Sequence, residues 1–139
     1  MAARIEQSAR DRRFEVKYLL DTHALLWARS TPDILSSDAL AVFKDPECLL
    51  FVSVASLWEC AIKCSVGKLV LPNEFYQIVD KDYRIMEINL AHLEAYRLLP
   101  MIHKDPFDRM LIVQAQLGDL TLVTRDENIR RYDVAVLNA

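Results

Sequence analysis

The stretch Val16-Lys17-Tyr18-Leu19-Leu20-Asp21 decides the fold of this chain, because it is a compact apolar run that ends in a carboxylate. A short apolar run of this kind is typical of a strand buried within a parallel sheet. In an open α/β sheet, the carboxyl ends of the parallel strands share one crevice. We therefore predict a parallel sheet with Asp21 at its functional edge.

Predicted strands and helices alternate along the rest of the chain. The strands are expected at 16–20, 48–53, 83–88, 120–124 and 134–137. The helices are expected at 23–29, 36–43, from a cap at Ser53 or Ser56 to Gly67, at 72–80, 90–99 and 105–117, with a helical turn at 127–132. Short links between alternating strands and helices predict an α/β fold: a three-layer α/β/α sandwich with a parallel sheet of about five strands.

Length, charge and composition narrow the possible classes. The chain has 139 residues, enough for one domain with a substantial core. Its net charge of −3 argues against a broadly basic nucleic-acid binder, because nonspecific affinity comes from Lys and Arg neutralising phosphates. We find neither an apolar run of membrane-spanning length nor a signal peptide, and the three cysteines suggest no disulfide framework. We therefore expect a cytoplasmic protein with no membrane association.

The first fifteen residues differ from the remainder, since they are polar, rich in Arg and without an apolar stripe. We interpret 1–15 as a flexible N-terminal extension or a start-site artefact, with a short helix as the competing interpretation. The folded domain is predicted to cover 16–139.

Four carboxylates stand out by their positions relative to the predicted elements: Asp21, Glu59, Asp108 and Asp126. Asp21 and Asp126 follow strands, Glu59 lies within a helix, and Asp108 lies in the first turn of another. Four carboxylates in one crevice require a cation, because like charges raise each other's pKa. Hard oxygen ligands suit Mg²⁺ or Mn²⁺, which indicates metal-dependent phosphoryl chemistry.

The first two acids also have simpler interpretations. Asp21 and Thr22 are both suited to cap a helix, since their side chains accept hydrogen bonds from free N–H groups. Glu59 is followed four residues later by Lys63, and this spacing is typical of an ordinary exposed ion pair on a helix.

The last two acids lie within capping patterns. Asp105 fits the N-cap of a helix, which makes Asp108 the residue at N3, where a carboxylate interacts well with the helix dipole. Thr124 and Glu127 match a capping box, a pattern that leaves Asp126 without a structural task.

Basic side chains near these acids complete the candidate site. They are Lys63, Lys68, Lys104, Arg109, Arg125, Arg130 and Arg131. Arg109 and Arg125 have two interpretations each, contact with a scissile phosphate or pairing with a neighbouring acid. His103 is interpreted as a loop histidine, with a supporting role behind the metal ligands as the alternative.

The combined order of these acids resembles the PIN-domain ribonucleases, and specifically the VapC-like toxins of type II toxin–antitoxin pairs. The resemblance is carried by Leu19-Leu20-Asp21-Thr22-His23-Ala24-Leu25-Leu26-Trp27, Ser53-Val54-Ala55-Ser56-Leu57-Trp58-Glu59, Asp105-Pro106-Phe107-Asp108-Arg109 and Leu122-Val123-Thr124-Arg125-Asp126. It covers the chain from about Val16 to the C-terminus. The 1–15 extension departs from the pattern, since such toxins usually begin close to the first strand.

This resemblance implies an activity and a set of partners. Asp21, Glu59, Asp108 and Asp126 match the acidic quartet of the family, and Thr124 matches its common hydroxyl companion. The implied protein is a Mg²⁺- or Mn²⁺-dependent endoribonuclease that hydrolyses RNA phosphodiester bonds and acts as a toxin. The implied partners are a cognate antitoxin, which occupies the active site, and a second copy of the chain in a homodimer.

Two other classes of function compete with this interpretation. A phosphotransferase with Asp21 as its nucleophile fits poorly, because haloacid-dehalogenase-like enzymes need an Asp where this chain has His23, and receiver-type signalling domains need adjacent acids after the first strand and a lysine after the last. A non-catalytic PIN-like module is the stronger alternative, with an acidic pocket that binds a protein partner.

Overall fold

The computed structural model describes residues 16–139, and the predicted extension at 1–15 lies outside them. Five strands form one sheet: β1 Lys17–Leu20, β2 Leu49–Ser53, β3 Arg84–Met86, β4 Thr121–Thr124 and β5 Val136–Asn138. Their order is β3-β2-β1-β4-β5, and every neighbouring pair is parallel. The predicted parallel sheet is therefore confirmed, with β1 at its centre.

The helices alternate with these strands as predicted. The α-helices are α2 Thr22–Ser30, α3 Ser37–Lys44, α4 Val54–Ser65, α5 Phe75–Asp82, α6 Leu90–Leu98 and α7 Pro106–Gly118. Two short 3₁₀ helices are η1 Pro32–Ile34 and η2 Ile129–Arg131. No helix within residues 16–139 combines the length and apolar character needed to cross a membrane.

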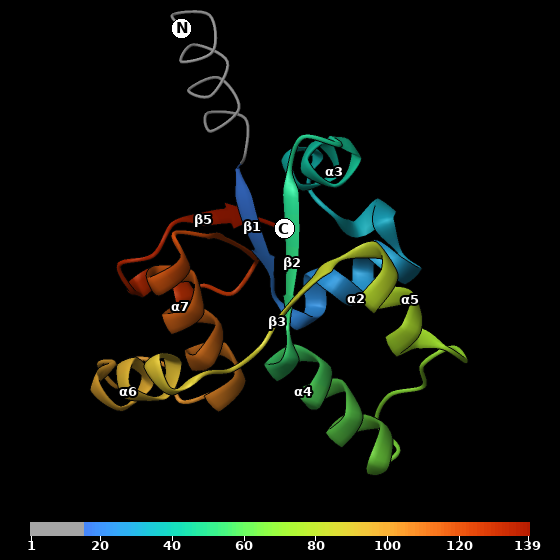
Figure 1. Ribbon diagram of the computed structural model, residues 1–139. Coiled ribbons are helices and arrows are strands. Elements are labelled where there is room, and N and C mark those ends of the chain that lie inside the picture. Colours follow the sequence, from blue (N-terminus) through green and yellow to red (C-terminus); the bar gives the residue numbers. More distant parts are fainter. Residues whose placement is uncertain (1–15) are drawn as a thin grey trace, which may run out of the picture.

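The core lies on both faces of the sheet, because neighbouring residues of a strand point to opposite sides. Leu20 and Val123 pack with α2, α3 and α5, whereas Leu19 and Leu122 pack with α7 and η2. Figure 1 shows these two groups of helices on opposite sides of the strands. The predicted three-layer α/β/α architecture is confirmed.

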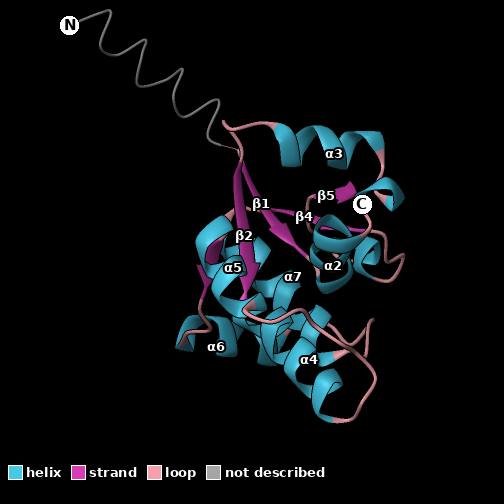
Figure 2. Cartoon of the chain, turned by 90° about the vertical axis from the view of Figure 1, so that its right-hand side faces the viewer, coloured by secondary structure: helices cyan, strands magenta, loops and turns pink. Residues whose placement is uncertain are grey.

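The chain order places a topological switch point beside β1. From β1 the chain continues to β2 and β3 on one side of the sheet, and then returns to β4 on the other side. In Figure 2, β1 leads into α2 and β2 leads into α4, so both strands end at the same edge. A crevice at the carboxyl ends of β1 and β4 follows from this topology.

Several predicted boundaries were wrong. The helix expected to begin at Pro72-Asn73 begins at Phe75, because the Phe75 N–H closes a turn onto the Pro72 carbonyl and Glu74 adopts a left-handed conformation with φ of 63°. The strand expected at 83–88 pairs only over Arg84–Met86.

The predicted capping box at Thr124 and Glu127 is also wrong. The only helical turn that follows β4 in the described chain is η2, which starts at Ile129. The Thr124 hydroxyl instead accepts the N–H of Asp126 (3.1 Å), and Asp126 Oδ1 accepts the N–H of Asn128 (2.8 Å). Asp126 therefore has the structural task that the sequence pattern assigned to its neighbours.

Candidate active site

Asp21 lies at the end of the central strand and begins α2. Its backbone N–H donates to the Val123 carbonyl (3.1 Å), which extends the pairing of β1 with β4 by one residue. Its Oδ1 accepts the N–H of Ala24 (2.7 Å), so the predicted helix cap is confirmed. Asp21 also lines the acidic cleft described below.

Thr124 joins the end of β4 to Asp21. Its side chain is fully buried, and its hydroxyl donates to the Asp21 carboxylate while accepting the N–H of Asp126. One hydroxyl thus contacts both acids that follow strands. The predicted hydroxyl companion bonds to the carboxylate of Asp21 and to the backbone of Asp126.

Glu59 reaches the same cleft from the middle of α4. Its Oε1 accepts a hydrogen bond from the Thr22 hydroxyl (2.6 Å), and its Oε2 lies 3.1 Å from Lys63 Nζ. The predicted ion pair with Lys63 is confirmed. The prediction that this pair is exposed is wrong for Glu59, because α2 packs against its side chain and leaves it only 13% exposed.

His103 lies between the two remaining acids. Its Nε2 is 2.8 Å from Asp108 Oδ2 and 3.3 Å from Asp126 Oδ2. The interpretation as an ordinary loop histidine was therefore incomplete. The sequence contained a signal for the proximity of His103 to Asp108, because a helix that starts at Asp105-Pro106 makes the chain turn between these two residues.

Two of the acids are held in environments that oppose ionisation. Burial raises the pKa of Asp21, and the charge of Asp126 adds to this effect, whereas hydrogen bonds from Thr124 and Ala24 oppose it. Burial also raises the pKa of Asp108 to about 7, with contributions from the charges of Asp105 and Asp21. Such mutual repulsion is the condition that a bound cation relieves.

All four predicted acids line one cleft of about 500 Å³. The lining residues are Asp21, Thr22, His23, Trp27, Glu59, Lys63, His103, Asp105, Asp108, Arg125 and Asp126. Ligand atoms of His103, Asp108 and Asp126 lie within 4.8 Å of one another, a spacing that allows one cation to contact more than one of them. The donor set is dominated by carboxylate oxygens, which suits Mg²⁺ or Mn²⁺.

The two arginines considered for phosphate contact differ in their positions and hydrogen-bond partners. Arg109 is 3% exposed and donates to the carbonyls of Leu99, Pro100 and His103, so neither predicted role holds for it. Arg125 lines the cleft, where its guanidinium lies 4.4 Å above the Trp27 ring and donates to the carbonyls of Ile34 and Ala139.

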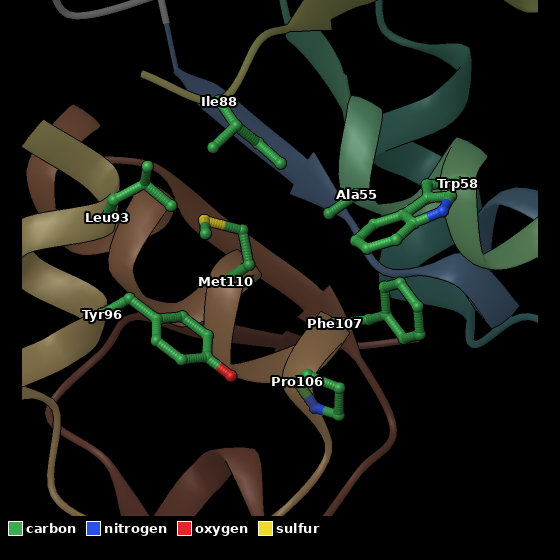
Figure 3. A pocket seen from close by; sticks show the side chains of 8 residues that line it. All are labelled: Ala55, Trp58, Ile88, Leu93, Tyr96, Pro106, Phe107 and Met110. Atoms are coloured by element: carbon green, nitrogen blue, oxygen red, sulfur yellow. The ribbon is translucent and has the colours of Figure 1, made fainter. Parts of the chain in front are cut away.

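A second pocket, of about 230 Å³, lies between α4, α6 and α7 (Figure 3). It is lined by Ala55, Trp58, Ile88, Leu93, Tyr96, Pro106, Phe107 and Met110. Trp58 and Phe107 meet edge to face at one side of it, with ring centroids 5.3 Å apart. This lining contains no carboxylate, imidazole or thiol, so the acidic cleft is the better candidate for chemistry.

Comparison with known proteins gives matches at two levels. The family model described as PIN domain matches residues 18–135. A search of curated proteins gives no match.

Several solved structures share the fold. VapBC2 from Rickettsia felis, bound to a DNA fragment from its promoter, superposes with a TM-score of 0.67 at 18% identity, covering 88% of this chain and 98% of that chain. FitAcB from Neisseria gonorrhoeae gives 0.63 at 19% identity, with coverages of 87% and 96%. A toxin–antitoxin complex from Klebsiella pneumoniae gives 0.63 at 18% identity, also with coverages of 87% and 96%. Identities this low establish the fold alone, whereas the family model covers most of the sequence, and the chain therefore belongs to the PIN domain family.

Proposed function

We propose that this chain is a metal-dependent endoribonuclease that hydrolyses RNA phosphodiester bonds and acts as the toxin of a toxin–antitoxin pair. The observation that carries the proposal is the convergence of Asp21, Glu59, Asp108 and Asp126 on one cleft, with Thr124 bonded to Asp21. These acids come from four separate segments, and neither the core nor helix capping requires them to meet.

The residues present fit a divalent cation. Oxygen donors face one cleft, and burial and neighbouring charges raise the pKa of both Asp21 and Asp108, so a cation would relieve an unfavourable arrangement. Asp21 is the best placed of the four to contact every bound ion, because it lies at the switch point. Glu59, Asp108 and Asp126 would complete the set of ligands.

In hydrolysis a water oxygen attacks the phosphorus and loses a proton, the bond to the 3′ oxygen breaks, and that oxygen takes up a proton, so the products carry a 3′ hydroxyl and a 5′ phosphate. A bound divalent cation supplies activation of the water and neutralises charge at the phosphate. Thr124 holds the Asp21 carboxylate in one orientation through its hydroxyl. Lys63 and Arg125 line the cleft, and their positive charges would attract the RNA backbone against the acidic background.

The biological role follows from the same proposal. The related structures include a toxin–antitoxin complex, and this likeness supports a cognate antitoxin as the protein partner. A cytoplasmic site of action is part of the proposal. A homodimer is part of the proposal, and sedimentation velocity on the purified chain measures it directly.

The test is cleavage of RNA by the purified protein. RNA should be cut in Mg²⁺ or Mn²⁺ and spared in excess EDTA, and the new ends should carry 5′ phosphates. Asp21→Asn should abolish cutting. Asp33→Asn is the matched control, because Asp33 is exposed in η1 and does not line the cleft, and it should cut as wild type does.

Three results would argue against the proposal. Cleavage that persists in EDTA, or products with cyclic phosphates, would exclude metal-dependent hydrolysis. Failure to cut any RNA, combined with tight binding of a protein partner, would favour the alternative of a non-catalytic PIN-like module with a partner-binding acidic pocket.

A further inference from the structure

The position of His103 in the acidic cleft is fixed from its backbone. The His103 N–H donates to the Tyr132 hydroxyl (2.8 Å), and its carbonyl accepts from Arg109 Nη1 (3.3 Å). Both partners are buried, and Arg109 also donates to the Tyr132 hydroxyl (3.2 Å). The loop between α6 and α7 therefore holds the imidazole against Asp108 and Asp126 by a buried network.

The hydrogen bonds of the ring determine which nitrogen carries the proton. Nδ1 of His103 lies 3.1 Å from the backbone N–H of Lys104, which can only donate, so Nδ1 is an acceptor. The neutral ring then carries its proton on Nε2. That N–H faces Asp108 Oδ2 at 2.8 Å and Asp126 Oδ2 at 3.3 Å.

This arrangement disfavours His103 as a metal ligand. Coordination through Nε2 would require the proton on Nδ1, where it would face the N–H of Lys104. A ring that coordinates a metal normally donates its other nitrogen to an acceptor, and here the other nitrogen meets a donor.

We propose that His103 is a positioning residue for the cation site, which donates its Nε2–H to Asp108 and holds Asp108 and Asp126 together. The proposal rests on the proposed function, because it presumes that these carboxylates bind a divalent cation. Oδ1 of Asp108 has no hydrogen-bond partner among residues 16–139, so this oxygen is left available to the cation. Groups of this kind, bonded to metal ligands, typically change metal affinity tenfold to a hundredfold when they are removed.

The test measures Mn²⁺ binding by EPR, without RNA and without a cleavage assay. His103→Leu removes the donor and should weaken Mn²⁺ binding by about tenfold to a hundredfold. His103→Gln places an amide N–H near the position of Nε2–H and should keep the affinity within a few fold of wild type. Asp33→Asn is the control, because Asp33 is exposed in η1 and does not line the cleft, and its affinity should be unchanged.

Pulsed EPR on Mn²⁺-loaded wild type adds a readout that needs no variant. Positioning through the N–H predicts no hyperfine coupling from a directly bound imidazole nitrogen. Such a coupling would overturn the proposal in favour of a ligand role. Tighter or unchanged binding by His103→Leu would also overturn it, as would equal losses in His103→Gln and His103→Leu. Wild type that binds no Mn²⁺ would instead remove the cation site itself, and with it the proposed function.

Discussion

Asp21 combines two tasks in one side chain, because one carboxylate caps a helix and faces an acidic cleft. Its Oδ1 is used by the N–H of Ala24, and the carboxylate is also bonded by the Thr124 hydroxyl. Burial raises its pKa despite these hydrogen bonds. The side chain is thus well placed for a cation and poorly placed for stability in the absence of one.

Replacing Asp21 separates these two tasks. Asp21→Asn should leave the metal-free protein as stable as wild type or more stable, because Asn caps about as well as Asp and the repelling charge is gone. Mg²⁺ should stabilise wild type by about 2.7 kcal/mol at a hundredfold excess over Kd, and the variant much less. Melting curves with and without Mg²⁺ measure both effects. An active variant, or equal Mg²⁺ shifts in both proteins, would leave capping as the only role of Asp21.

Asp108 predicts a pH dependence for the metal-free protein. Its pKa is raised to about 7 by burial, so the folded state binds the proton more tightly than the unfolded state does. Stability should therefore fall as the pH rises from about 4, the pKa of an unfolded Asp, toward about 7, and this contribution should change little above that.

Chemical denaturation in EDTA at pH 5 and pH 8 checks this dependence. Asp108→Asn is neutral at both pH values and should lose less stability between them than wild type does. Equal losses in the two proteins would show that Asp108 is not the group responsible.

At the scale of elements, each helix that borders the cleft begins with a side-chain cap. Asp21 caps α2, Ser53 caps α4 through the N–H of Ala55 (3.0 Å), and Asp105 caps α7 through the N–H of Asp108 (2.9 Å). Because the caps fix where each helix starts, they also fix which of its residues face the cleft. Asp108 lies in the first turn of α7, where the helix dipole favours a negative charge.

The α7 cap makes a prediction about stability. Asp105→Ala should cost about 1 kcal/mol of unfolding free energy, because the Asp108 N–H loses its acceptor. Asp105→Asn removes the same charge but keeps the cap, and it should stay close to wild type. Urea denaturation of the three proteins at one pH compares them, and equal stabilities for the Ala and Asn variants would contradict a capping role.

At the scale of the whole molecule, the cleft lies where the chain switches from adding strands on one side of β1 to adding them on the other. The strands β2 and β3 lie on one side of β1, and β4 and β5 lie on the other. Each acid then reaches the same edge of the sheet from a different segment.

Residues 1–13 are predicted to contribute little to the stability of the whole molecule. Deleting residues 1–13 should change the free energy of unfolding by no more than about 0.5 kcal/mol, the range of neutral surface changes, because the segment offers no apolar stripe to bury. Thermal denaturation of the full and shortened chains measures the difference. A loss several times larger would show that the segment packs against the domain.

The sequence by itself determined the features that depend on local chemistry. The apolar run at 16–20 predicted the central strand, and Asp105 predicted the start of α7. These predictions succeeded because a cap acts over three residues and a strand pattern over five. The capping box at Thr124 failed because η2 begins only at Ile129, and the Thr124 hydroxyl accepts the N–H of Asp126 while it bonds to Asp21, which is distant in sequence.

Only the tertiary structure decided how the candidate site is assembled. The Thr22 hydroxyl meets Glu59 across 37 residues of sequence, and the ring of His103 reaches Asp126 from another loop. Arg109, a candidate for phosphate contact in the sequence, is turned inward onto backbone carbonyls instead. These outcomes depend on which faces of α2, α4 and α7 pack against one another. Residue spacing along the chain carries no record of that packing, because it is set by the burial of apolar surface between segments far apart in sequence.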